Sequence, residues 1–265
     1  MNVPLDASAQ PLVLREDADG VATLTLNRPA AFNALNGAML DAMRSALDAV
    51  ATDESVRVVV LAGAGRAFCP GHDLKEMLAN SNEAFLGDLF RRCSDVMLAI
   101  RRAPQPVIAR VHGIATAAGC QLVAACDLAV AASDSRFATS GINFGLFCAT
   151  PGVPVSRNVA PKRAFEMLMT GEFIDAATAL DWGLLNRVAE PDQLHDVTLK
   201  LARTLLEKPR AVVAEGKRFF YRQLELRTEE AYVEATGVIT CNMLGPDAQE
   251  GVTAFVEKRK PNWAK

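Results

Sequence analysis

Residues 67–77, with the sequence AFCPGHDLKEM, bring together the groups from which several kinds of site are made. Cys69 and His72 stand three positions apart, Gly71 lies between them, and Asp73 follows. A thiol and an imidazole could form a nucleophile with its base, or two ligands of a metal ion. The glycine and the acid could instead shape a turn whose backbone N–H groups bind an anion.

The rest of the sequence supports these alternatives unequally. A metal site would need further ligands, and no other pair of cysteine and histidine offers them. Nothing near Cys69 favours the thiolate that a nucleophile requires. GAGRAF at 63–68 follows a strand-like run, as a dinucleotide-binding loop would, but Phe68 replaces the third glycine. We therefore favour the backbone turn, which could bind an anion or be purely structural.

A second stretch, HGIATAAGCQLVAACD at 112–127, repeats the pattern of strand end, small residues and helix start. Small residues at 115 and 117–119 allow another group to approach the backbone closely. In the first stretch, Asp73 is placed to cap a helix that begins LKEM. Two such turns that face each other could direct their N–H groups at one carbonyl oxygen, which is an oxyanion hole.

Each turn follows a run that is typical of a strand buried on both faces, VRVVVLAG and PVIARVHG. A hairpin is expected at 12–26, a helix capped by Asn36, another helix at 83–102, and a strand at 126–132. This alternation of strands and helices predicts an α/β domain with mainly parallel pairing. Three more helices are expected, at 210–225, 228–244 and 246–258. We divide the chain into a flexible N-terminus, an α/β core and a helical appendage, at 1–10, 11–205 and 206–265.

Composition excludes some classes of function. The 265 residues carry 28 basic and 31 acidic side chains, and aromatic residues make up 6%, so neither a basic patch nor a base-stacking surface for nucleic acid is expected. No apolar run is long enough for a membrane span. The six cysteines form no C-x-x-C pair and are expected as reduced thiols. With no signal-like N-terminus, these features predict a cytoplasmic protein.

Several motifs resemble those of the crotonase family, which includes enoyl-CoA hydratases and isomerases. RAFCPGHDLKEM resembles the family's A-F-x-x-G-x-D-[LI], and PVIARVHGIATAAGCQL resembles its K-P-V-I-A-x-V-x-G-x-A-x-G-G-G-x-E-L. NRPAAFNALN resembles N-R-P-x-x-x-N-A-L, and the matches continue in order over residues 12–263. GINFGLFCATPG, together with AAGCQ, is similar to the subgroup called enoyl-CoA hydratase domain-containing proteins.

The resemblance implies a spiral of β-β-α units followed by a helical trimerisation region, with assembly into homotrimers or homohexamers. It implies an acyl-CoA thioester as substrate, no separate cofactor and no metal. The thioester carbonyl would be held by the backbone N–H groups of His72 and Ala118. The positions that would contact coenzyme A are Arg28, Ala30, His72, Asp73, Leu74, Lys75 and Lys258.

The sequence departs from the family pattern at two positions. Hydratases of this family use two glutamates as acid and base, and Gln121 and Gly141 stand in their places. Neither residue can exchange a proton near neutral pH, and each positioned acid or base contributes about 10²–10⁴-fold to rate. Gln121 can still donate and accept hydrogen bonds, and Asn143 is another polar candidate nearby.

These observations lead to one hypothesis and two alternatives. The hypothesis is an enzyme of the enoyl-CoA hydratase/isomerase type that stabilises a thioester enolate. The first alternative is decarboxylation of a malonyl-type thioester, which needs an oxyanion hole more than it needs two carboxylates. The second is a non-catalytic protein that binds acyl-CoA.

Overall fold

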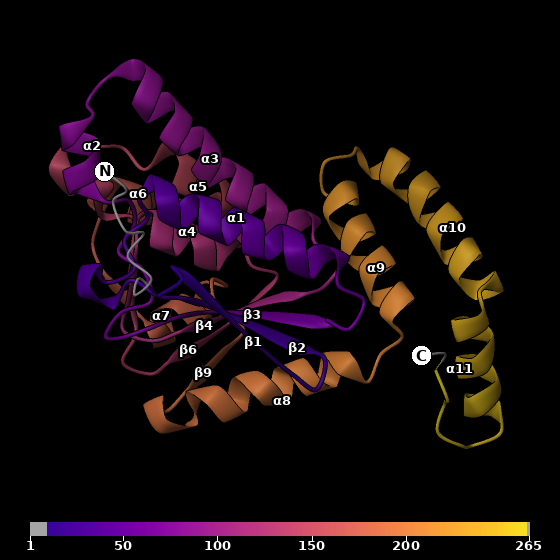
Figure 1. The fold of residues 1–265 in the computed structure, drawn as a ribbon. Coiled ribbons are helices and arrows are strands. Elements are labelled where there is room, and N and C mark those ends of the chain that lie inside the picture. Colours follow the sequence, from indigo (N-terminus) through magenta and orange to yellow (C-terminus); the bar gives the residue numbers. More distant parts are fainter. Residues whose placement is uncertain (1–9, 264–265) are drawn as a thin grey trace, which may run out of the picture.

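The structure is a computed structural model that describes residues 10–263. A six-stranded sheet lies at its centre, in the order β1-β2-β3-β4-β6-β9 (Figure 1). The first two strands form the expected antiparallel hairpin, and every further pair in this sheet is parallel. The strands are β1 (Val13–Ala18), β2 (Val21–Leu26), β3 (Val58–Gly63), β4 (Val107–Val111), β6 (Leu128–Ala132) and β9 (Arg187–Ala189).

The central strands are buried on both faces, as their β-branched runs predict. Val58 and Val60 of β3 pack in one apolar cluster with Leu201 of helix α8 (Leu194–Leu206). Val59 and Leu61 point to the opposite face, because side chains alternate along a strand. That face is covered by α1 (Gly37–Thr52), α3 (Glu83–Arg102) and α4 (Ala118–Ala125), while α8 lies on the other side (Figure 1).

A second, smaller sheet has the order β5-β7-β8. Its strands are β5 (Ile114–Thr116), β7 (Arg136–Ala138) and β8 (Ile174–Asp175). Cys69, which follows β3, joins this sheet through a parallel bridge to Ala115. Successive turns of the chain therefore add a strand to the large sheet, a short segment to the small one, and then a helix. This is the predicted spiral of β-β-α units.

Local signals fix the helix starts. The Asn36 side chain accepts a hydrogen bond of 2.9 Å from Met39 N and begins α1, and Asn82 begins α3 in the same way. Asp73 caps α2 (Leu74–Ala79). The remaining short elements before α8 are η1 (Pro29–Ala31), η2 (Ser140–Phe144), α5 (Ala149–Asn158), α6 (Pro161–Thr170), α7 (Ala176–Asp181) and η3 (Pro191–Gln193).

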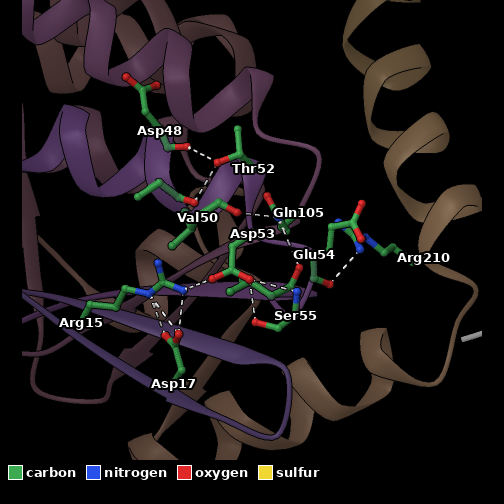
Figure 2. A network of polar contacts seen from close by, with 12 residues as sticks. Arg15, Asp17, Asp48, Val50, Thr52, Asp53, Glu54, Ser55, Gln105 and Arg210 are labelled. Atoms are coloured by element: carbon green, nitrogen blue, oxygen red, sulfur yellow. Dashed lines mark hydrogen bonds and ion pairs between the residues drawn. The ribbon is translucent and has the colours of Figure 1, made fainter.

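Three helices follow the core: α9 (Arg210–Gln223), α10 (Thr228–Leu244) and α11 (Pro246–Val256). They stand to one side of the sheet (Figure 1). Figure 2 shows one connection, in which Arg210 Nη1 donates to the carbonyl oxygen of Glu54 at 2.7 Å. The predicted boundary at 205/206 falls at the end of α8, but the division into regions stays a prediction. The expected flexible segment 1–10 lies outside the described residues except for Gln10.

A buried ionic network attaches α9 to the core. Lys217 Nζ lies 2.7 Å from Asp127 Oδ2 and also donates to the carbonyl oxygens of Ile100 and Gln105. Tyr221 donates to the other Asp127 oxygen at 2.7 Å. Burial raises the pKa of the Asp127 carboxyl and lowers the pKa of the Lys217 ammonium, so each group is held charged mainly by its partners.

Within residues 10–263, none of the helices is both long enough and apolar enough to span a bilayer.

Candidate active site

The first predicted turn is held between two neighbouring backbone segments. Cys69 N donates to Ile114 O at 3.1 Å, and Leu35 N donates to Gly71 O at 2.8 Å. Gly71 has a φ of +102°, a conformation that residues with side chains rarely adopt. The N–H of His72, the next residue, has no backbone acceptor among residues 10–263. The turn therefore leaves one amide free to bind a ligand.

The imidazole of His72 is not arranged to act in catalysis. It packs edge-on against the ring of Phe90, with a centroid separation of 5.3 Å. Its Nε2 is buried without a hydrogen-bond partner, and burial lowers the pKa of His72 to about 4. The side chain is therefore neutral near pH 7, and the backbone N–H is the polar group that this residue offers.

The second turn contains an alanine in an unusual conformation. Ala117 has φ 49° and ψ −119°, the region of the first central residue of a type II′ turn, which favours glycine. Its N–H donates to Ala138 O at 3.0 Å. Ala118 is the first residue of α4, where N–H groups have no partner within the helix, and no side chain caps this end.

The two turns lie against each other. A Cβ atom on Gly71 would be 3.2 Å from Ala118 N and 3.0 Å from the Cβ of Ala117. Thr116 N also donates to Cys69 O at 3.1 Å, which fixes the two segments side by side. The backbone at Gly71 therefore lies close to the start of α4. The assignment of the two turns to one oxyanion hole stays a prediction.

The predicted coenzyme A positions near the first turn form one group. Arg28 Nη1 lies 2.7 Å from Asp73 Oδ2, and this contact is the main cause that lowers the pKa of Asp73. Asp73 in turn accepts hydrogen bonds from Lys75 N at 3.0 Å and Glu76 N at 3.3 Å. Arg28 thus joins the loop that contains η1 to the start of α2. Three predicted positions on these elements are exposed: Ala30, Leu74 and Lys75.

Gln121 lies on α4, one turn after Ala118. Its side chain is only 3% exposed, and its Oε1 has no hydrogen-bond partner. Gln121 N donates to Ala117 O, so the residue belongs to the first turn of the helix. The side-chain amide of this buried residue therefore has an oxygen without a hydrogen bond within the described chain.

Gly141 is the second residue of η2, and the space for a side chain there is closed. A Cβ atom on Gly141 would lie 2.5 Å from Leu146 O and 2.8 Å from Cys148 Sγ. A second carboxylate is thus excluded at this position unless the backbone moves. Asn143 donates to Gly171 O at 3.2 Å, which ties η2 to the end of α6.

A pair of hydroxyl groups at this place was missed by sequence reasoning. Thr116 Oγ1 and Ser140 Oγ lie 2.6 Å apart and connect the second turn to η2. Thr116 is buried and Ser140 is half-buried. Serine and threonine are common enough that no local pattern singles out two of them 24 positions apart.

Lys258 is not brought to this site by its own chain. It follows α11, which Figure 1 places at the opposite end of the molecule from α2. A contact between Lys258 and the turns would require a second copy of the chain.

The structure disagrees with two other interpretations of residues 67–77, the cysteine nucleophile and the dinucleotide-binding loop. Cys69 is completely buried, and burial raises the pKa of its thiol to about 12, so no thiolate forms near neutral pH. Residues 64–67 form a turn that leads into the bridge at Cys69 and not directly into a helix, unlike a dinucleotide-binding loop.

The spiral and its two adjoining turns define an α/β protein of the crotonase fold. The family model described as enoyl-CoA hydratase/isomerase matches residues 16–265, and the chain belongs to that family. A solved enoyl-CoA hydratase of Mycobacterium smegmatis has 60% identity and a TM-score of 0.94, covering 96% of this chain and 99% of the other. Human enoyl-CoA hydratase domain-containing protein 3 has 43% identity and a TM-score of 0.92, covering 96% and 100%.

One further relative corrects an expectation. The mouse protein named "Enoyl-CoA hydratase domain-containing protein 3, mitochondrial" is 43% identical, and the match covers 98% of this chain and 87% of the relative. Rat and human proteins with the same name match similarly. The prediction of a cytoplasmic location is therefore wrong by this comparison. It depended on composition and on the appearance of the N-terminus, and neither identifies a compartment.

Proposed function

We propose that this chain binds an acyl-CoA thioester and polarises its carbonyl between the backbone N–H groups of His72 and Ala118. The observation that carries the proposal is the contact between the two turns, each of which offers an amide without a backbone acceptor among the described residues. A carbonyl oxygen that accepts both hydrogen bonds becomes easier to convert to an enolate. One donor of this kind contributes roughly 3–4 kcal/mol to the transition state.

The start of α4 adds to this effect. Backbone dipoles give the N-terminus of a helix a partial positive charge, and Ala118 is the first residue of that helix. Cys69, Gly71 and Ala115 pack around the turns and keep them close without charged side chains. A negative oxygen would therefore meet two aimed donors in a shielded place, where their electrostatic effect is larger than in water.

We propose that the chain is an acyl-CoA enzyme of the hydratase or isomerase type. Water addition is limited because the Gln121 amide does not ionise near neutral pH and cannot act as a general acid or base, and Gly141 has no room for a carboxylate. The coenzyme A contacts that we propose are Arg28, Ala30, His72, Asp73, Leu74, Lys75 and Lys258, and Asn143 is a further proposed substrate contact near Gln121.

The same observation favours decarboxylation as a second candidate. In a malonyl-type thioester, the bond between the α-carbon and the carboxylate breaks, and its electron pair forms the enolate while CO₂ leaves. The two N–H groups would hold the enolate oxygen, and solvent would protonate the α-carbon. This step needs no acid or base from position 121 or 141.

Infrared difference spectra of bound acyl-CoA, labelled with ¹³C at the thioester carbonyl, test the proposal. We expect the C=O stretch to move to lower wavenumber on binding, because two donors weaken the bond. Ala118→Pro removes one N–H at the first position of a helix, and it is made in an Ala117→Gly background, because an alanine before proline cannot keep the backbone conformation of Ala117. Glu83→Pro makes the same change at the start of α3 and is the matched control.

The proposal predicts that Ala118→Pro loses much of the shift, whereas Glu83→Pro keeps it. Gly71→Ala is a second variant, because its Cβ would crowd Ala118 N. Circular dichroism establishes that each variant is folded. Unshifted spectra with the unmodified protein, or no binding of any acyl-CoA, would contradict the proposal. Turnover of crotonyl-CoA and CO₂ release from methylmalonyl-CoA then separate hydration, decarboxylation and binding alone.

We also propose that the chain assembles as a homotrimer or a pair of trimers. Large apolar side chains are exposed along α10 and α11, which a single chain leaves uncovered: Tyr232, Val233, Ile239, Leu244 and Phe255. Exposed apolar area of this kind favours a protein interface. Light scattering after gel filtration measures the mass, and a monomer at micromolar concentration would contradict the assembly.

A further inference from the structure

A cavity of about 520 Å³ lies between the C-terminal part of α3 and helix α9, where Figure 1 shows the last three helices standing beside the core. Its volume falls within the range of small-molecule sites, roughly 300–1,000 Å³. The residues of 10–263 that line it include none assigned to the proposed active site. On α3 they begin at Leu98, two helical turns after Phe90, which packs on His72. The cavity is therefore a second place where a ligand could bind.

The walls of this cavity are rich in guanidinium groups that come from both helices. The arginines of the lining are Arg101 and Arg102 at the end of α3, and Arg218 and Arg222 on α9. Among the described lining residues, the carboxylates are Glu215 and Glu225. Lys217 also lines the cavity, but its charge is already paired with Asp127. Arginines thus outnumber carboxylates four to two, and the lining attracts anions.

These arginines are available to a ligand. Arg102 is exposed and has no ion pair among residues 10–263, whereas Arg101 pairs with Glu225 at 2.7 Å and Arg222 pairs with Glu234 at 3.0 Å. The side chains of Glu225 and Arg222 are 66% and 62% exposed, and surface pairs of this kind contribute only about 0–1 kcal/mol. The paired guanidinium groups can therefore turn toward an anion at little cost.

The lining also indicates what else the ligand contains. Guanidinium groups match phosphate oxygens closely, because two parallel N–H groups can donate to one phosphate. Between the arginines the wall is apolar, with Leu98, Ala211, Ala214 and the ring of Tyr221. The Arg101 guanidinium lies 4.6 Å from the centre of that ring. A bare inorganic ion would leave this apolar surface uncovered, whereas a ligand with a planar or apolar part would cover it.

We propose that this cavity binds a small anion with two or more phosphate groups and a planar or apolar part, the chemistry of a nucleoside diphosphate. The phosphates accept hydrogen bonds from Arg102 on one side and from Arg218 or Arg222 on the other. The ligand thereby connects α3 with α9 and stabilises the attachment of α9 to the core, because it binds the docked arrangement alone. This site does not depend on the two turns or on the acyl-CoA that we propose for them.

Isothermal titration with ADP, pyrophosphate and adenosine tests the inference. The proteins are the unmodified chain, Arg102→Gln, Arg218→Gln and Arg91→Gln. Arg91 lies on α3, is exposed, pairs with Asp88 and Asp95, and is not among the residues that line the cavity, so it provides a matched control. The other two arginines are also exposed, and circular dichroism establishes that each variant is folded.

We expect ADP to bind at least about tenfold more tightly than adenosine, and more tightly than pyrophosphate. Arg102→Gln and Arg218→Gln should each weaken ADP binding by about tenfold, the effect of one lost hydrogen bond to a charged group, and Arg91→Gln should leave it unchanged. Hydrogen exchange provides the location, because ADP should slow exchange in residues 98–104 and 211–222. Added salt should weaken binding, since it screens the charges.

Other results would overturn the inference. Coenzyme A itself contains an ADP group, so ADP could bind at the proposed active site. In that case Arg102→Gln would bind ADP as the unmodified chain does, and exchange would slow in α2 instead. An acidic segment of a second copy could also fill the cavity, and ADP would then not bind at all. Butyryl-CoA is titrated separately, and its failure to bind would contradict the proposed function without affecting the result for the cavity.

Discussion

The carbonyl oxygen of Cys69 occupies the space into which a side chain on Gly119 would project. The start of α4 therefore packs directly on the backbone of the first turn. Because the blocking atom belongs to the main chain, it cannot move aside as a flexible side chain could. The contact explains why the two turns meet and why the second residue of α4 is glycine.

Gly119→Ala should accordingly destabilise the protein strongly. We expect a loss of at least about 3 kcal/mol in the free energy of unfolding, since overpacking a buried backbone contact costs more than a typical core change. Urea unfolding followed by circular dichroism measures it. Gly216→Ala on α9 is the control, because a Cβ there meets nothing within 4 Å and should stabilise the helix by about 1 kcal/mol. Equal effects of the two changes would refute the packing argument.

Ala117→Gly should stabilise the protein. Ala117 has a positive φ of 49°, and strain of this type costs about 1–3 kcal/mol. Glycine relieves the strain but loses about 0.5–1 kcal/mol through the greater freedom of the unfolded chain. A net gain of about 1 kcal/mol is expected in urea unfolding. Ala49→Gly, at an exposed position of α1, should instead lose about 1 kcal/mol, and a similar loss at both positions would contradict the prediction.

Local patterns were sufficient for much of the fold. Asn36 precedes an apolar period of 3.6 residues, and the helix at 83–102 has a capping asparagine and a following proline, so both helices were predictable from neighbours in sequence. The buried strands were predictable because parallel strands covered on both faces leave continuous β-branched runs. The two turns were predictable as a pair because small residues follow each of these strands.

The finer features of the site depend on contacts that no sequence pattern reveals. Leu146 is only five positions from Gly141, but nothing in the sequence indicates that its carbonyl oxygen fills the space beside Gly141. The meeting of Thr116 with Ser140 results from the pairing of β5 with β7, which no local pattern reveals. Lys258 lies far from the site because of the placement of α11. Sequence motifs alone therefore do not show whether Lys258 would reach the site of its own chain or that of a second copy.

The buried imidazole of His72 should make stability depend on pH. Burial lowers its pKa to about 4, whereas the unfolded chain has the ordinary value of about 6.5. Below pH 6.5 the unfolded state therefore takes up the proton first, and stability falls as the pH drops toward 4. The stabilisation is fully present above pH 6.5, and the loss amounts to about 3 kcal/mol.

The measurement compares urea unfolding at pH 7 and pH 4.5 in the unmodified protein, His72→Leu and His195→Gln. His72→Leu should lose less stability between the two pH values than the unmodified protein does, because no buried imidazole remains. His195→Gln should follow the unmodified protein. Identical pH dependence in all three would show that His72 is not the group responsible. Because the backbone N–H is retained, His72→Leu should also bind acyl-CoA within a few-fold of the unmodified protein.

Lys217 should be essential for holding α9 on the core. Its side chain is 7% exposed and pairs with Asp127, so Lys217→Met leaves a buried carboxylate without its cation. Removing one partner of such a pair costs about 3–5 kcal/mol. Tyr221→Phe removes a single hydrogen bond to the same carboxylate and should cost about 1–2 kcal/mol.

Limited proteolysis and urea unfolding together measure this attachment. Lys217→Met should expose the segment between α8 and α9 to cleavage, whereas Tyr221→Phe should remain resistant. Adding Asp127→Asn to Lys217→Met should recover part of the lost stability, because the unpaired charge is then gone. If Lys217→Met costs no more than Tyr221→Phe, or if the double variant is less stable than the single one, the ion pair is not what fixes α9.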